Sequence, residues 1–534
     1  MQEESKIMDS DGGRSEKDHI VKAAGTVGSL TFLSRILGYV RDMAIASIFG
    51  AGVHTDAFIA AFRIPNLMRR LFGEGALSVA FVPVFSQYLI RDNSGDAYRL
   101  ARASLRLLTL ILFFLVLAGI WAAPLIIRGL APGFIDDPDK MTLTITLTRI
   151  MFPYLFFIGL VALSMSILNT LGHFAAPALA PVFLNIAMLG ALWTASIFFV
   201  SQDEKVMVLS CGVLLGGGLQ LILQFPFLHR CGIAFRWRGP FFHPGLKKVG
   251  RLLLPTIFGS SVYQINILVG TFLASQLPQG SISYLYYADR LVQFPLGVFA
   301  VALGTAVLPA LSRQAAVKDY SGLKQTFSEA LNLIFFISIP SMVGLIILRQ
   351  PIVSLLFERG AFDPKTSQLT ADALLYYGAG LWAFSAVRVL LPTFYALQDT
   401  WMPVKISLVS ISTNIVLGIM LMKTMGHCGL ALATTLSSAL NVTLLIFALR
   451  LRLGAMNWRE NFLSVSKSIF CAFLMGGVVW WMAHLDWSLR QNSRLLLFGY
   501  IAIMIAVGVG IFLISAATVR MREVKTIWGI LRKA

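Results

Sequence analysis

The sequence contains few charged residues. Only 13% of its 534 residues are Asp, Glu, Lys or Arg, whereas 57% are apolar and the mean hydropathy is +0.76. Soluble domains contain roughly 45–50% apolar and about 25% charged residues, so this composition excludes an ordinary water-soluble fold. Apolar runs of about 20 residues, long enough to cross a hydrocarbon core about 30 Å thick, recur from Leu30 onward. The sequence therefore predicts an all-α polytopic membrane protein.

Cysteine is scarce, and motifs for metals and nucleotides are missing. The four cysteines lie singly in apolar stretches without a CxxC pair, and the seven histidines are dispersed. The sequence contains no HExxH or Walker A motif. The glycines from Gly212 to Gly218 have the GxxxG spacing of close helix packing inside an apolar span. We expect no metal site, no cofactor and no phosphate-binding loop.

Basic residues gather in alternate loops. The formal net charge of +18 would suggest nucleic-acid binding in a soluble protein. Here Lys and Arg collect within residues 91–106, 230–251, 313–324, 450–467 and 520–533, and the loops between are poor in them. Because cytoplasmic loops of membrane proteins carry this excess, we expect both termini on the cytoplasmic side of a bacterial inner membrane. No nucleic-acid partner is expected.

Hydropathy and turn residues divide the chain into about fourteen candidate spans. They are residues 24–50, 55–90, 103–130, 142–171, 177–200, 205–229, 249–277, 281–312, 325–349, 368–397, 402–423, 426–450, 463–485 and 493–518. The predicted organisation is a polar cytoplasmic tail (1–21), an N-terminal lobe (22–230), a cytoplasmic linker (231–248), a C-terminal lobe (249–453), two further spans (454–520) and a basic cytoplasmic tail (521–534).

A weak internal repeat relates the two lobes. Residues 81–86 (FVPVFS) resemble 307–312 (VLPALS), and 168–177 resemble 394–403, both at an offset of 226 positions. Residues 32–34 and 258–260 keep the same offset. Six predicted spans separate equivalent points, so the repeats should be parallel and related by an axis along the membrane normal. We expect two parallel six-helix lobes around a central cavity, followed by two C-terminal helices.

The first two predicted spans contain charges that are costly in lipid. A charge at the bilayer centre costs about 2.5–3.5 kcal/mol even on lenient insertion scales, so it should face a cavity and have a partner or a function. The charged residues of these spans are Arg35, Arg41, Asp42, Asp56, Arg63, Arg69, Arg70 and Glu74. Pro65 and the Gly-Glu-Gly sequence around Glu74 should interrupt the second span, as in helices that line a cavity.

These charges suggest an anionic ligand. Five arginines against three acids leave a surplus of positive charge, and the planar guanidinium group binds phosphate oxygens with paired hydrogen bonds. A diphosphate would neutralise the surplus. The equivalent entry in the second lobe is Asp289-Arg290, at the start of the eighth predicted span, and Arg388 lies inside the tenth. Alternatively, the arginines reach the lipid headgroups or form structural ion pairs. The aspartates could hold arginines in place or contact a substrate or coupling ion.

At these residues the chain resembles the MurJ (MviN) family of lipid II flippases. The similar motifs are SRILGYVRD (34–42), DAF (56–58), RIPNLMRRLFGEGA (63–76), AFVP (80–83), ADR (288–290) and LFERGAF (356–362). The resemblance extends from about Lys22 to the last span. It implies the fold of the multidrug, oligosaccharidyl-lipid and polysaccharide exporter superfamily. It also implies a lipid flippase of peptidoglycan synthesis and cell-shape maintenance, not an enzyme.

The resemblance also implies the substrate and its site. Lipid II, an undecaprenyl-diphosphate-linked disaccharide peptide, would pass from the cytoplasmic to the periplasmic leaflet, and a groove beside the last two helices would hold its lipid tail. The residues implied to form the cavity are the arginines Arg35, Arg41, Arg69 and Arg290, the acids Asp42, Asp56 and Glu74, and the basic position Arg388. No acid matches the sodium site of some relatives.

We expect transport by alternating access, driven by the membrane potential or a coupling ion. Expected partners are lipid II, membrane lipids and the cell-wall synthesis machinery. A flippase for another polyprenyl-diphosphate-linked glycan stays an alternative. An exporter of cationic drugs should carry carboxylates in its cavity, not surplus arginine. A membrane glycosyltransferase or polymerase would need a catalytic carboxylate on a roomy outer loop, and the predicted outer loops are short.

Overall fold

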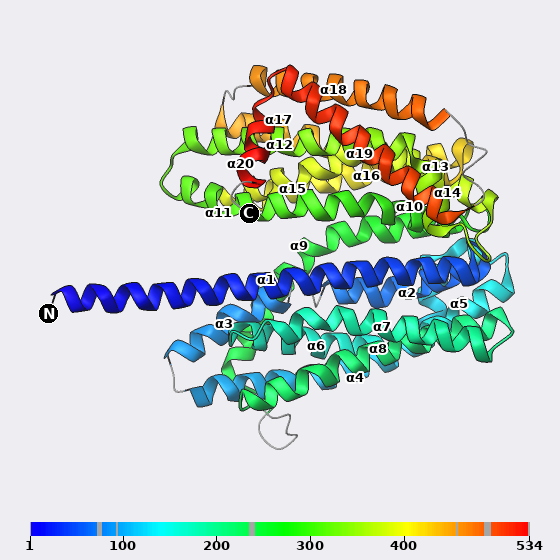
Figure 1. Ribbon diagram of the computed structural model, residues 1–534. Helices are drawn as coiled ribbons and strands as arrows, with labels where there is room; N and C mark the ends of the chain where they lie inside the picture. The colour runs from blue at the N-terminus through cyan, green and yellow to red at the C-terminus, as the bar shows by residue number, and fades with distance from the viewer. Residues whose placement is uncertain are drawn as a thin grey trace. The chain divides into compact units, whose positions relative to one another are not determined.

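The protein is built from α-helices (Figure 1). The computed structural model describes residues 2–71, 77–91, 94–233, 241–454, 458–484 and 493–531, and within these ranges it contains no strand. Lipid offers no hydrogen-bond partner to the backbone, and a helix satisfies its peptide groups internally. The all-helical prediction is confirmed.

The helices fall into two compact units, Met1–Phe49 with Val53–Leu268, and Gly50–Gly52 with Val269–Ala534. The first unit contains α1 (Gln2–Phe49), α2 (Val53–Leu71), α3 (Leu77–Arg91), α4 (Ser94–Leu130), η2 (Pro132–Phe134), α5 (Pro138–Met151), α6 (Tyr154–Thr170), α7 (Ala175–Phe198), α8 (Gln202–Arg230) and most of α9 (Pro244–Ser275). The second contains α10 (Ser281–Pro295), η3 (Leu296–Ala300), α11 (Val301–Ala316), α12 (Tyr320–Ile347), α13 (Arg349–Phe357), α14 (Pro364–Ala379), α15 (Leu381–Ala396), α16 (Trp401–Met425), α17 (His427–Leu453), α18 (Trp458–His484), α19 (Arg494–Thr518) and α20 (Arg522–Leu531).

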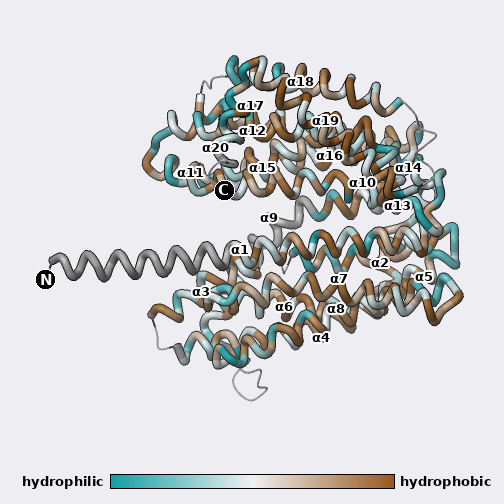
Figure 2. The backbone as a smooth tube through the Cα atoms, viewed as in Figure 1, coloured by the Kyte–Doolittle hydropathy of each residue, from teal (hydrophilic) through white to brown (hydrophobic). Residues whose placement is uncertain are grey.

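Many of these helices can span a membrane. In the described part, ten helices are long and apolar enough, and an eleventh span counts if α14 and α15, bent by 42°, are taken together. Figure 2 shows hydrophobic residues along most of α4, α18 and α19. Large side chains such as Trp121 and Phe473 are exposed, as expected for surfaces that face lipid. The remaining predicted spans correspond to α1, α2 with α3, and α9, so the count of fourteen stays a prediction.

The internal repeat is visible in where the helices begin. Helices α4, α5 and α7 start at Ser94, Pro138 and Ala175, and α12, α14 and α16 each start 226 positions later. Asp137 and Asp363 cap α5 and α14 in the same way, each accepting a hydrogen bond from the backbone N–H three residues on. Hydrogen bonding by Thr366 lowers the pKa of Asp363, which keeps this cap ionised. The repeat predicted from short matches is therefore a repeat of helices.

The division between the units lies later than the predicted lobe boundary. The first unit continues to Leu268, whereas the second lobe was expected to begin at residue 249. Val249 is buried in the core of the first unit, and Leu246 and Leu253 pack against that core. The first turns of α9 thus belong to the first unit by packing, although they follow the linker in sequence.

The second predicted span is two helices. Helix α2 continues through Pro65, so the interruption predicted at this residue is wrong. The helix ends at Leu71, and α3 begins at Leu77. The interruption predicted at residues 73–75 lies outside the described residues, between these two helix ends. In the second unit, the π-helical turn Leu296–Ala300 stands between α10 and α11 at the corresponding place in the repeat. Such π turns occur frequently at functional sites.

The predicted GxxxG packing is confirmed between α7 and α8, which lie side by side in Figure 1. A Cβ atom at Gly212 would lie 2.4 Å from the Cβ atom of Ala191, and one at Gly216 would lie 2.7 Å from Cδ1 of Leu184. A Cβ atom at Gly218 would meet no atom within 4 Å. The first two glycines therefore allow the close approach of the helices.

We expect Gly212→Val to lower the free energy of unfolding by about 1–3 kcal/mol, because the added methyl groups overpack the contact with Ala191. Thermal unfolding of the purified protein in detergent measures the effect. Gly218→Val is the matched control and should leave the midpoint nearly unchanged. Equal effects of the two substitutions would contradict this assignment of the packing face.

Candidate functional site

A buried arginine network joins α1 to α7 in the first unit. The Arg41 guanidinium donates from Nε and Nη2 to Oδ1 of Asp42, at 3.0 and 2.7 Å. Its Nη1 donates to Oδ1 of Asn185 at 2.9 Å, and Nδ2 of Asn185 donates to the backbone carbonyl of Ser34 at 2.9 Å. Arg41 is 7% exposed and Asp42 is fully buried. The network fixes the guanidinium relative to both helices.

This geometry bears on the two interpretations of Asp42. The carboxylate holds Arg41, as one of the predicted roles requires. Hydrogen bonds to Asp42 and Asn185 orient the guanidinium and hold its position before any ligand arrives, and such preorganisation lowers the entropic cost of binding an anion. Contact of Arg41 or Asp42 with a substrate stays a prediction. Sequence spacing could not identify Asn185 as a partner.

A second buried ion pair joins α2 to α5. The Lys140 ammonium donates to Oδ2 of Asp56 at 2.9 Å, and the two residues are 6% and 2% exposed. Lys140 Nζ also lies 4.1 Å from the centre of the Phe134 ring, within the range of a cation–π interaction. Asp56 thus has a lysine of α5 as a partner. Lys140 follows several aspartates in sequence, as a residue of an exposed outer loop would. The sequence therefore did not identify Lys140 as a buried partner of Asp56.

The arginines of α2 are less enclosed. Arg63, Arg69 and Arg70 are half-buried in the last turns of the helix. Nε of Arg69 donates to Oδ1 of Asn66 at 3.1 Å, one helical turn earlier. Glu74 lies outside the described residues, so its predicted place beside these arginines stays a prediction.

Arg35 differs from Arg41 in its surroundings. It lies on α1 two turns before Asp42, where spacing places it on the same helix face. Its side chain is exposed, whereas that of Asp42 is fully buried. The structure therefore joins Ser34, Arg41 and Asp42 of α1 to Asn185 of α7 in one network. Arg35 stays at the surface of its unit.

The predicted site residues of the second unit lie on α10 and α15. Asp289 is exposed and accepts a hydrogen bond of 3.4 Å from Gln293. The half-buried Arg290 guanidinium lies 6.0 Å from the ring centre of Tyr286. Arg388 is exposed, and a Cβ atom at Gly304 of α11 would lie 2.2 Å from its backbone oxygen. Close contact between α11 and α15 therefore positions Arg388.

The two repeats differ in electrostatics. The positions 226 residues after Arg41, Asp42, Asp56 and Lys140 hold Ile267, Leu268, Ile282 and Thr366, none of which carries a charge. Both buried ion pairs thus occur in the first unit without a counterpart at the equivalent positions of the second. The shared helical framework carries different chemistry in its two halves.

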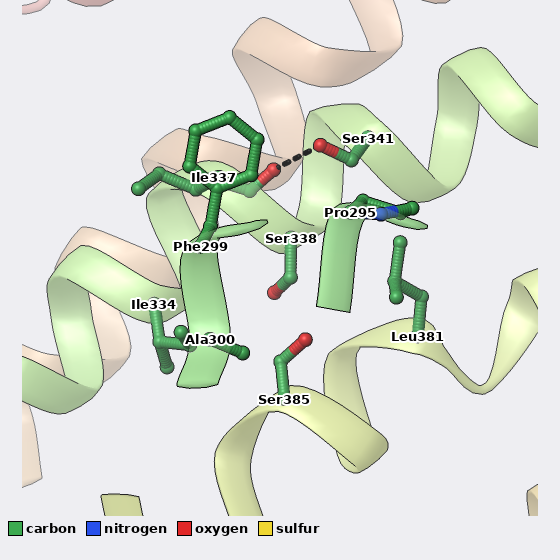
Figure 3. Close-up of a pocket in the computed structure, with 9 residues that line it drawn as sticks. All are labelled: Pro295, Phe299, Ala300, Ile334, Ile337, Ser338, Ser341, Leu381 and Ser385. Atoms are coloured by element: carbon green, nitrogen blue, oxygen red, sulfur yellow. Dashed lines mark hydrogen bonds between the residues drawn. The ribbon is translucent and has the colours of Figure 1, made fainter. Parts of the chain in front are cut away.

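The pocket in Figure 3 belongs to the second unit. It lies beside the π-helical turn and is lined by Pro295, Phe299, Ala300, Ile334, Ile337, Ser338, Ser341, Leu381 and Ser385. Its volume of about 10 Å³ is room for about one water molecule, far less than a diphosphate or a sugar needs. The hydroxyl groups of Ser338 and Ser385 point into it (Figure 3). This pocket is therefore not a site for a glycolipid headgroup.

Comparison with known proteins places these features in a family. A family model described as "Lipid II flippase MurJ" matches residues 45–497. The chain is 38% identical to "Probable lipid II flippase MurJ" of Vibrio cholerae serotype O1, covering 93% of this chain and 98% of that protein. It is 36% identical to "Lipid II flippase MurJ" of Burkholderia cenocepacia, with 88% and 92% covered.

Solved structures are similar as well. The structure named "Lipid II flippase MurJ, inward closed conformation" aligns with a TM-score of 0.78 at 28% identity, covering 92% of this chain and 98% of that chain. An inward-facing transporter of the multidrug resistance MATE family aligns with a TM-score of 0.67 at 16% identity, covering 80% and 98%. The second likeness concerns the fold alone.

Proposed function

Since the chain belongs to the MurJ family of lipid II flippases, we propose that it moves lipid II from the cytoplasmic to the periplasmic leaflet for peptidoglycan synthesis. It is a multi-pass membrane transporter, not an enzyme. The observation that best supports an anionic headgroup as cargo is the preorganised Arg41 guanidinium, buried among apolar helices.

The proposed mechanism is alternating access. Arg41 supplies a fixed guanidinium for the diphosphate, and Arg35, Arg69, Arg70, Arg290 and Arg388 add positive charge along the path. Asp42 orients Arg41, Asp289 and Glu74 balance the surplus charge, and Asp56 is paired with Lys140. Phosphate binds well to guanidinium groups because each offers several donors in a plane. No covalent step is needed, since the cargo is unchanged by transport.

The proposed orientation places both termini in the cytoplasm of the inner membrane. It is supported by the alternation of basic segments, including the exposed Arg450 and Arg452 in the last turn of α17 and the exposed Arg459 at the start of α18. In this orientation α18 and α19, which pack against each other, would hold the lipid tail. Cell-wall synthesis enzymes on the outer side would use the delivered precursor.

Complementation tests the function. We expect this chain to restore growth, and the appearance of labelled lipid II in the outer leaflet, when the host's own lipid II flippase is depleted. The control is a variant of this chain that does not transport lipid II but whose insertion into the membrane has been verified. If the inserted wild-type chain fails to move lipid II and instead moves another polyprenyl-diphosphate-linked glycan, the alternative cargo is correct.

Collapsing the membrane potential should slow transport. An inside-negative potential favours the outward movement of a net anion by about 2.3 kcal/mol per charge per 100 mV. If one charge crosses most of the field, we expect the transport rate to fall about tenfold or more when the potential is removed. Outer-leaflet lipid II would be followed in vesicles with an imposed potassium diffusion potential. A rate that ignores the potential but follows an imposed sodium or proton gradient would point to a coupling ion instead.

A further inference from the structure

The last helix of the described residues is short and follows the last candidate span. Helix α19 ends at Thr518, and Arg520 adopts a left-handed backbone conformation with φ of 54°. Such a residue ends the helix and turns the chain. Helix α20, Arg522–Leu531, begins directly after this turn. It is therefore a separate element at the end of α19, not an extension of the span.

One side of α20 is fixed to α18. The buried Glu523 carboxylate accepts a hydrogen bond from the Ser464 hydroxyl, and Met521, just before the helix, is also buried. Nζ of Lys467 donates to the backbone oxygen of Val519 at 3.2 Å. An exposed ion pair between Arg522 and Glu460 adds a 3.5 Å contact. These bonds hold α20 across the adjacent ends of α18 and α19.

The other side of α20 presents basic and aromatic groups. Trp528 is 60% exposed, and Val524, one turn before it, is half-buried. Val524 and Trp528 share a helix face because they are four residues apart. Arg520, Lys525 and Thr526 are exposed next to this face. An apolar face edged by cations, with tryptophan at its border, is typical of a helix that lies in a membrane interface.

We propose that α20 binds the anionic headgroups of the inner leaflet and so fixes the cytoplasmic ends of α18 and α19 at the membrane surface. Arg520 and Lys525 would contact lipid phosphates while Trp528 inserts at headgroup depth. We infer an anionic partner because these exposed side chains are cations. We infer that this partner is the lipid bilayer because α20 lies at the end of a membrane span. The proposal rests on the proposed orientation, which places the C-terminus in the cytoplasm.

The test measures lipid binding by the full chain, independently of transport. The purified protein in detergent is titrated with phosphatidylglycerol or phosphatidylcholine, and its thermal unfolding midpoint is followed. We expect phosphatidylglycerol to raise the midpoint at lower concentration. In Arg520→Gln/Lys525→Gln, half-maximal stabilisation should need about 25-fold more phosphatidylglycerol, because each basic residue near an anionic surface contributes about a fivefold factor. The response to phosphatidylcholine should not change.

Lys423→Gln is the matched control, because it removes an exposed lysine at the end of α16 and should leave both titrations unchanged. The proposal is overturned if the double variant responds to phosphatidylglycerol as the wild type does, if the control weakens the response equally, or if the wild type does not distinguish the two lipids. A failure here leaves the complementation result untouched, so the two proposals fail separately.

Discussion

Replacing Arg41 by Met together with Asp42 by Asn should give a folded, inserted protein that no longer moves lipid II at a useful rate. The two substitutions remove both charges of the buried pair and keep similar side-chain volumes. Exchange of a buried ion pair for neutral groups of similar size is often neutral for stability or stabilising. A loss of transport in this variant would therefore report on the missing guanidinium, not on unfolding.

The expected loss of transport is about 10- to 100-fold. A hydrogen bond to a charged group contributes about 1.5–3 kcal/mol, and each 1.4 kcal/mol corresponds to a factor of ten. Labelled lipid II reaching the outer leaflet measures the rate, and thermal unfolding measures stability. Transport at the wild-type rate by the stable double variant would mean that Arg41 and Asp42 have a purely structural role.

The single substitution Arg41→Ala is a poorer test, although it should also abolish transport. It leaves the fully buried Asp42 carboxylate without its guanidinium and removes the hydrogen bond that Nη1 gives to Asn185. Breaking a buried pair in this way costs about 3–5 kcal/mol. Loss of function would then mix a missing contact with a damaged fold, which is why the paired neutral substitution separates the two causes.

The helical framework could be predicted from the sequence because its signals are local. Apolar runs set the length of each helix, and Asp-Pro sequences mark where α5 and α14 begin. The repeat could be found from short matches because duplicated helices keep their spacing, as the starts of α7 and α16 confirm. The Arg41–Asp42 pair was also within reach, since adjacent residues of opposite charge in an apolar span must satisfy each other or a ligand.

The cross-helix partners could not be predicted in this way. Asn185 lies 144 positions from Arg41, and Lys140 lies 84 positions from Asp56. Helical periodicity gives the face on which a side chain lies, but not which neighbouring helix packs against that face. Counting the charges of the first two spans omits a lysine contributed by α5, so it could not identify Lys140 as a partner of Asp56.

Lys140→Met should destabilise the protein strongly, and adding Asp56→Asn should restore both stability and transport. The single change leaves a buried carboxylate that has lost its ammonium partner at 2.9 Å, so we expect a cost of about 3–5 kcal/mol and a lower abundance in the membrane. In the double variant neither charge remains to be compensated. Thermal unfolding and membrane abundance measure the first effect, and labelled lipid II in the outer leaflet measures the second.

Rescue is expected here and not at Arg41 because the two pairs differ in what they offer a ligand. Both cations are buried and paired, Lys140 at 6% and Arg41 at 7% exposed, but the Lys140 ammonium is a single point of charge covered by the Phe134 ring. Arg41 has a planar guanidinium with several donors, suited to phosphate oxygens as well as to Asp42. If the Asp56→Asn/Lys140→Met protein is stable but does not transport, then Asp56 or Lys140 contacts the cargo or a coupling ion. The functional charges would in that case extend from α1 and α7 to α2 and α5.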